Sequence, residues 1–181
     1  LDIAEVHLLQ AKALYLQLYG ENAIQLSTLY TNFVDFYMKT SKFNLAVEYA
    51  QKAYDIDKKI LGENHPEFAT TTMNLGRALM YASRYDEAET KLKQSLSIRT
   101  KLFGENHFTC AYSYQNLAEL YAQMSLNKEA TTFAEKANTI FLKTFGKNSV
   151  EYAVTTNILG EQAIFIANYS LATTKFLESL D

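Results

Sequence analysis

The sequence predicts an all-α solenoid of antiparallel helix pairs, built from a repeating unit of 42 residues. The first observation is a column of glycines, each followed two positions later by asparagine: Gly20, Gly62, Gly104 and Gly146. The second is a column of alanines at the same interval: Ala4, Ala46, Ala88, Ala130 and Ala172. The third is the scarcity of helix breakers, since 181 residues contain one Pro and six Gly, which favours long helices. A repeat of this period indicates supersecondary units that bury their apolar faces against each other.

The first helix of the unit is predicted over residues 66–82. Asn64 precedes it as the expected N-cap, because its side chain can accept a hydrogen bond from an unpaired backbone N–H. Pro66 suits the first turn, where its missing N–H costs little. Apolar residues at helical spacing follow, which predicts one buried face.

The second helix is predicted over residues 85–103, after a short break at 83–84. Gly104 is expected to end it in a left-handed conformation that residues with a Cβ resist. The pattern makes residues 1–181 one array of a lone second helix, three full repeats and an incomplete last repeat: 1–20, 21–62, 63–104, 105–146 and 147–181. The chain starts at Leu1 without an initiator Met and stops at Asp181 inside an expected helix. We therefore expect both ends to be boundaries within a longer protein.

Residues 61–66 (LGENHP) and 85–89 (YDEAE), with the related segment 102–107 (LFGENH) one unit later, resemble the long tetratricopeptide repeat of kinesin light chains. The resemblance covers essentially the whole chain. It implies a right-handed superhelix whose role is protein binding, as a scaffold or adaptor. HEAT and armadillo repeats have lengths that bracket 42, but the Gly-x-Asn loop and the small-residue columns favour the tetratricopeptide assignment.

The resemblance also implies a concave groove lined by the first helix of each pair. When Leu75-Gly76 is placed on the family's Leu-Gly/Ala position, the preceding column holds Asn32, Asn74, Asn116 and then Ile158. An amide offers both a donor and an acceptor, which suits the backbone of an extended peptide. The alternative is that these amides serve helix–helix contacts or face solvent.

Residues three or four positions apart share a helix face, so the column has predicted neighbours in the groove. Together with the asparagines, the candidate peptide-binding residues are Asp35, Lys39, Arg77, Tyr81, Tyr112, Glu119, Asn157 and Glu161. Their charges are mixed, which predicts a ligand with apolar or aromatic anchors and mixed charge. Because Arg77 is the one clear basic neighbour of the asparagines, a clamp for a C-terminal carboxylate is disfavoured. Solvation of these charges, or pairing between units, remains the alternative for each residue.

Several function classes are disfavoured. A net charge of −3 argues against nucleic acid, which requires a basic face, and the aromatic residues, such as Tyr85 and Phe103, are expected to pack in the core. No apolar run is long enough for a membrane span. Cys110 is the single cysteine, so no intrachain disulfide can form, and a reducing, cytoplasmic location is expected.

Catalytic and metal-binding patterns are not recognisable. His65 and His107 are one repeat apart, too far to share a metal, and a histidine beside a helix start is expected to pack or cap. Cys110 is expected to be buried and inert. We therefore predict no enzyme activity, no cofactor and no metal.

The sequence favours a scaffold that binds a peptide segment of a partner protein. Two alternatives stay open. The array could be architectural, with self-association through the repeat ends, or it could be the regulatory or substrate-recruiting part of a larger enzyme.

Overall fold

All regular secondary structure among residues 3–180, the part of the chain that the computed structural model describes, is α-helical. The chain divides into two compact units, residues 1–98 (unit 1) and 99–181 (unit 2). The predicted all-α class and the pairing of successive helices within each unit are confirmed. None of the described helices is both long and apolar enough to cross a membrane.

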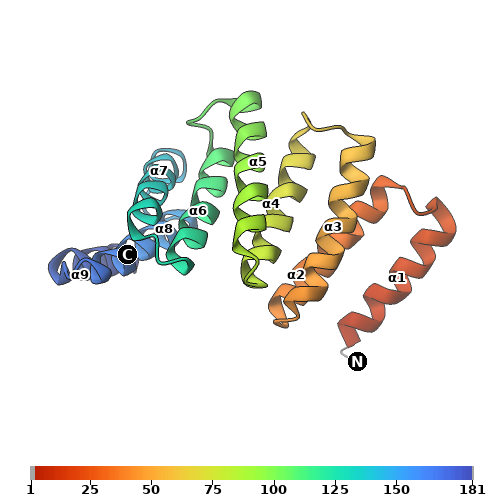
Figure 1. The fold of residues 1–181 in the computed structure, drawn as a ribbon, viewed down its shortest axis with the longest axis horizontal. Coiled ribbons are helices and arrows are strands. Elements are labelled where there is room, and N and C mark those ends of the chain that lie inside the picture. The colour runs from red at the N-terminus through yellow and green to blue at the C-terminus, as the bar shows by residue number, and fades with distance from the viewer. Residues whose placement is uncertain (1–2, 181) are drawn as a thin grey trace. The chain divides into compact units, whose positions relative to one another are not determined.

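Unit 1 contains four complete helices and the beginning of a fifth. They are α1 (Ile3–Tyr19), α2 (Ile24–Lys39), α3 (Phe43–Ile60), α4 (Pro66–Tyr81) and α5 (Tyr85–Phe103). Consecutive helices pack against each other, and α2 also contacts α4 directly (Figure 1). The first helices of successive repeats are therefore neighbours in this unit.

Unit 2 continues in the same way. Its complete helices are α6 (Phe108–Gln123), α7 (Asn127–Phe145), α8 (Val150–Phe165) and α9 (Tyr169–Glu178). Here α6 contacts α8 as well as α7. The expectation that a helix runs on to Asp181 falls at that residue outside the described part of the chain, and α9 ends at Glu178.

Small residues allow the two helices of a repeat to approach closely. Ala46, Ala88 and Ala130 are fully buried and Ala172 is 3% exposed, as their column predicts, whereas Ala4 of α1 is exposed. Gly76 of α4 lies against Leu92 of α5, where a Cβ would be only 2.8 Å from the leucine side chain. A small residue on one helix thus accommodates a large one on the other, which keeps the packing dense.

The turn between the two helices of each repeat repeats one backbone motif. Its residues with positive φ are not glycines but Ser41, Ser83, Ser125 and Ala167, with φ between 55° and 60°. At Ser83 the N–H donates to Met80 O, and the next N–H donates to Leu79 O. This is the hydrogen-bond pattern of a Schellman motif. This motif could not be predicted from the sequence, because serine lacks the conformational freedom that marks glycine for such a position.

The glycine column ends the second helices, as predicted, with φ between 75° and 86°. At Gly146, however, ψ is 177°. This residue therefore lies outside the left-handed helical region and in a region open essentially to glycine alone. The prediction of a positive φ is confirmed, while the expected left-handed helical cap is wrong at Gly146.

The predicted N-cap of α4 is also wrong. The cap is His65, whose Nδ1 accepts a hydrogen bond from the Glu67 N–H at 3.1 Å, whereas Asn64 is exposed one residue earlier. His107 caps α6 in the same way, with Nδ1 3.4 Å from the Thr109 nitrogen. Imidazole can replace the usual amide here because its unprotonated nitrogen is an acceptor. The helix after Pro66 ends at Tyr81, with Ala82 as its C-cap.

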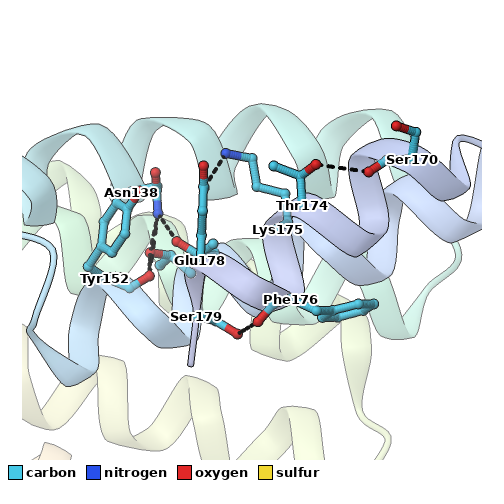
Figure 2. A network of polar contacts seen from close by, with 10 residues as sticks. Asn138, Tyr152, Ser170, Thr174, Lys175, Phe176, Glu178 and Ser179 are labelled. Carbon is cyan, nitrogen blue, oxygen red and sulfur yellow. Dashed lines mark hydrogen bonds and ion pairs between the residues drawn. The ribbon is translucent and has the colours of Figure 1, made fainter. Parts of the chain in front are cut away.

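Buried polar contacts join helices at the repeat boundaries. In unit 2, Asn138 of α7 donates to the hydroxyls of Thr155 and Thr156 on α8, at 3.1 and 2.8 Å (Figure 2). Arg99 is 5% exposed and donates to the Thr109 carbonyl and the Ser113 hydroxyl of α6. Because these buried groups are paired, they fix the register of neighbouring helices without a large desolvation cost.

Candidate functional site

A polar cavity lies in unit 1 beside two of the predicted asparagines. It has a volume of about 310 Å³, and Asn32 of α2 and Asn74 of α4 both line it. Thr28 and Thr70, one turn before the asparagines, line it as well. The direct contact of α2 with α4 brings these equivalent residues of successive repeats together. The asparagine and threonine side chains thus present amide and hydroxyl groups to a ligand in the cavity.

A carboxylate contributed by α3 lies at the same cavity. Asp57 lines it and is only 3% exposed. One of its oxygens, Oδ2, accepts a hydrogen bond from the Thr71 hydroxyl at 2.7 Å. The other, Oδ1, is buried and has no hydrogen-bond partner within the described part of the chain. Glu67 is the other ionisable residue of the cavity lining, which includes no Lys, Arg or His.

Sequence reasoning missed Asp57. Its repeat column reads Tyr15, Asp57, Arg99 and Phe141. Two opposite charges stand there between two aromatic residues, on helix faces that otherwise pack against a neighbour. This contrast is a signal that could have identified the position, because a charge at a core position is unusual unless it is paired.

The other predicted residues of unit 1 lie elsewhere. Asp35 and Lys39 are exposed and Arg77 is half-buried, and none of the three lines the cavity between Asn32 and Asn74. Tyr81 stacks on Phe43, with ring centroids 5.6 Å apart. It lines a separate cavity of about 420 Å³ at the turns that follow α2 and α4.

In unit 2 the asparagine column adopts a different environment. Asn116 is 6% exposed, and its amide donates to the carbonyl oxygen of Tyr112 in the preceding turn, at 2.6 Å. The Tyr112 hydroxyl donates to Glu151 of α8 at 2.8 Å. Burial, and then this hydrogen bond, raises the pKa of Tyr112 to about 12. Both side chains thus have partners within the protein.

Three further predicted residues of unit 2 meet at one cavity. Glu119 of α6 and Asn157 and Glu161 of α8 line a space of about 380 Å³. Asn157 donates to Glu161 through its amide at 2.9 Å. Apolar Val154 and Ile158 line the same space. The cavity is acidic and partly apolar.

The thiol of Cys110, the single cysteine, has a structural role. Cys110 is fully buried, its thiol lies 3.3 Å from the Gly104 carbonyl oxygen, and burial raises the pKa of that thiol. Residues 3–180 contain no group of three His, Cys, Asp or Glu side chains that could hold a metal ion.

The two aromatic residues that were expected in the core differ in exposure. The prediction of a core position for Phe103 is wrong, because this side chain is 41% exposed and stacks on His107. Tyr85 is half-buried.

Comparisons with known proteins agree with this architecture. Residues 26–67 and 67–143 each match a family model described as a tetratricopeptide repeat. No curated protein sequence matches the chain.

Solved structures resemble the fold over most of the chain. BtubC (BKLC) from P. vanneervenii is 20% identical with a TM-score of 0.81, over 97% of this chain and 73% of that protein. A putative kinesin light chain from Podosopora anserina is 21% identical with a TM-score of 0.74, over 85% of this chain and 74% of that protein. MamA is 17% identical with a TM-score of 0.63, over 94% of this chain and 84% of that protein. At these identities the likeness concerns the fold.

Proposed function

Because the chain belongs to the tetratricopeptide repeat family, whose repeats generally mediate protein–protein interactions, we propose that it binds a peptide segment of a partner protein. The proposed binding surface is the groove between the first helices of successive repeats. Repeats of this family are typically non-catalytic, and the protein is accordingly proposed to act as a scaffold or adaptor and not as an enzyme.

One observation carries the proposal. Asn32 and Asn74 line the same cavity, although they are one repeat apart in sequence. Two amides at equivalent positions of neighbouring helices can each exchange hydrogen bonds with the backbone of an extended chain. Thr28 and Thr70 add hydroxyl groups to the same lining. A surface that offers donors and acceptors together is suited to main-chain recognition, with side-chain pockets providing specificity.

The other candidate residues contribute to different extents. Asn116 keeps a small exposed fraction and already donates to its own helix, so we assign it a lesser role than Asn32. Glu119, Asn157 and Glu161 would recognise a basic or polar segment at their own cavity in unit 2. Asp35, Lys39, Arg77, Tyr81 and Tyr112 are proposed to contact the flanking parts of a ligand.

The test is to select peptides from a displayed random library on the full chain and to measure their affinity by calorimetry. A variant with Asn32→Ala and Asn74→Ala should bind the selected peptides about tenfold more weakly, since a hydrogen bond contributes roughly 0.5–1.5 kcal/mol. The matched control is Asn44→Ala with Gln51→Ala, which removes two exposed amides from α3. The control should retain the parent affinity. Equal affinity of both variants would contradict the groove proposal.

A second candidate function is self-association. Large apolar side chains are exposed along α8 and α9, among them Phe165 at 64%, Ile166 at 67% and Tyr169 at 67%. Exposed apolar groups of this size mark interaction surfaces. Sedimentation velocity over a hundredfold range of concentration tests this function, and Phe165→Ser with Tyr169→Ser should abolish any concentration-dependent assembly. A regulatory or substrate-recruiting role in a larger enzyme is compatible with either function.

A further inference from the structure

Among the described residues of unit 1, Asp57 is a buried charged group with one unpaired oxygen. It is 3% exposed and belongs to α3, yet it lines the cavity between α2 and α4. Its Oδ2 accepts the Thr71 hydroxyl hydrogen bond, while Oδ1 has no partner among the described residues. An ionised oxygen taken out of water without a partner is costly. Oδ1 is itself buried, so a ligand would reach it through a small shift of the cavity lining, and a donor placed there would recover that cost.

The surroundings select the charge of such a ligand. The cavity lining holds two carboxylates, Asp57 and Glu67, and includes no basic side chain. The lysines closest in sequence are engaged outside the cavity, because Lys58 pairs with Glu63 at 2.7 Å and Lys59 donates to Asn22 at 3.2 Å. In the absence of an internal counter-charge, the field in the cavity favours a cation.

The chemistry of the cavity also narrows the kind of cation. The described residues include no group of three His, Cys, Asp or Glu side chains that could hold a metal ion, so an organic cation is the ligand considered. The volume of about 310 Å³ lies at the lower end of ligand cavities. It therefore suits a single side chain and not a drug-sized molecule.

We propose that Asp57 binds the ammonium group of a lysine side chain presented by the partner peptide. This proposal rests on the proposed function and names the residue that the groove would recognise. Lysine is favoured over arginine because only Oδ1 is unoccupied, whereas a guanidinium group pairs best with two open oxygens. Ile24 and Leu61 line the same cavity and can cover the methylene stem of the lysine. Asn32 and Asn74 then hold the peptide backbone on either side.

The test uses the full chain and three capped tripeptides, with lysine, norleucine or arginine between two glycines. Binding is followed by the amide resonances of Asn32, Asp57 and Asn74 in NMR titrations. The lysine peptide should shift these resonances in a saturable way and bind about tenfold more tightly than the norleucine peptide, which lacks the charge. Its affinity should fall with added salt. Arginine should bind more weakly than lysine.

Two variants isolate the carboxylate. Asp57→Asn keeps an acceptor for Thr71 but removes the charge, so the lysine peptide should bind about tenfold more weakly. Asp55→Asn removes the same charge from an exposed position on the same helix and should leave the affinity within about twofold of the parent. The wild-type comparison of lysine with norleucine tests the proposal even where the Asp57 variant is poorly folded.

The outcomes separate this site from the wider function. Equal binding of lysine and norleucine, unchanged binding in a folded Asp57→Asn variant, or no shift with any tripeptide would overturn the lysine site. Such a result leaves the groove proposal standing where selected peptides still depend on Asn32 and Asn74. Conversely, lysine binding through Asp57 with no effect of the asparagine variant would retain this site and reject the amide groove.

Discussion

The contact between Gly76 and Leu92 predicts a strong energetic coupling between the two residues. A Cβ at position 76 would lie 2.8 Å from Cγ and Cδ2 of Leu92 and 3.2 Å from its backbone nitrogen. Leu92 is fully buried and the nitrogen belongs to a helix, so neither can move far. Gly76→Ala therefore introduces a clash, and overpacking of this kind costs about 1–3 kcal/mol.

An opposing effect reduces that cost. Alanine is favoured over glycine in a helix interior by about 1 kcal/mol. We expect Gly76→Ala alone to destabilise the protein by about 1 kcal/mol, the difference between the two effects. Leu92→Ala alone should cost about 3 kcal/mol through lost burial and the resulting cavity.

In the Leu92→Ala background the same alanine at position 76 has room. It should then stabilise the protein by about 1.5 kcal/mol, from helix propensity together with one buried methyl group. The coupling energy is therefore about 2.5 kcal/mol, within the range seen for residues in contact. Unit 2 has the corresponding pair Ala118 and Ala134, both fully buried, which shows that two alanines are compatible with this position.

The assay is urea unfolding of the four proteins followed by circular dichroism, with the free energy taken from the midpoint and the slope. A coupling energy below about 0.5 kcal/mol would refute the reasoning, because contacting residues would then behave as independent ones. A changed slope would indicate that the units no longer unfold together.

The remaining predictions concern four single substitutions. Ser83→Gly should stabilise the protein by up to about 1 kcal/mol in urea unfolding, because it relieves a left-handed conformation, whereas Gly104→Ala, at φ 86°, should destabilise it by at least about 1 kcal/mol. The pKa of Tyr112 is raised to about 12, above the ordinary value of about 10. The protonated tyrosine therefore stabilises the folded state. This contribution to the unfolding free energy is complete below pH 10 and is lost as the pH rises towards 12. Tyr112→Phe should therefore reduce the loss of unfolding free energy between pH 10 and 12, and an unchanged pH profile would contradict the raised pKa that burial and the Glu151 hydrogen bond give Tyr112. Asp57→Asn should raise the unfolding temperature, because a neutral amide costs less to bury than a carboxylate with an unpartnered oxygen; a lower unfolding temperature would mean that the charge is compensated.

Much of the fold was predictable because it depends on steric rules that repeat. A glycine every 42 residues marks a backbone conformation that other residues avoid, and buried alanines mark close helix crossings. The helix over 85–103 was predicted at both ends, from the break at 83–84 and from Gly104. The caps were not, since His65 takes a role that sequence preference assigns to Asn64. Both residues can accept a backbone hydrogen bond, and the local path of the chain decides between them.

The candidate site was less predictable than the fold. The sequence placed Asn32, Asn74 and Asn116 in one column, but the exposure of each amide depends on its neighbours. The amide of Asn116 donates a hydrogen bond to a carbonyl oxygen of its own helix and is buried, whereas Asn32 is exposed. Periodicity fixes which helix face a residue occupies, and it does not fix the side-chain partner.

Asp57 combines a buried charge, which should lower the stability of the fold, with a place in the proposed lysine site. Stability and lysine-binding measurements on Asp57→Asn separate these two properties. Its repeat column holds aromatic residues and a paired arginine, so an aspartate with an unpartnered oxygen is not required by the repeat. If Asp57→Asn both stabilises the chain and weakens lysine binding, the carboxylate lowers stability and serves recognition, as is usual for functional groups in folded proteins. If the variant stabilises the chain without any effect on lysine binding, the unpartnered oxygen reflects imperfect packing alone. The pair of measurements thus distinguishes a binding residue from a tolerated defect, which neither measurement does by itself.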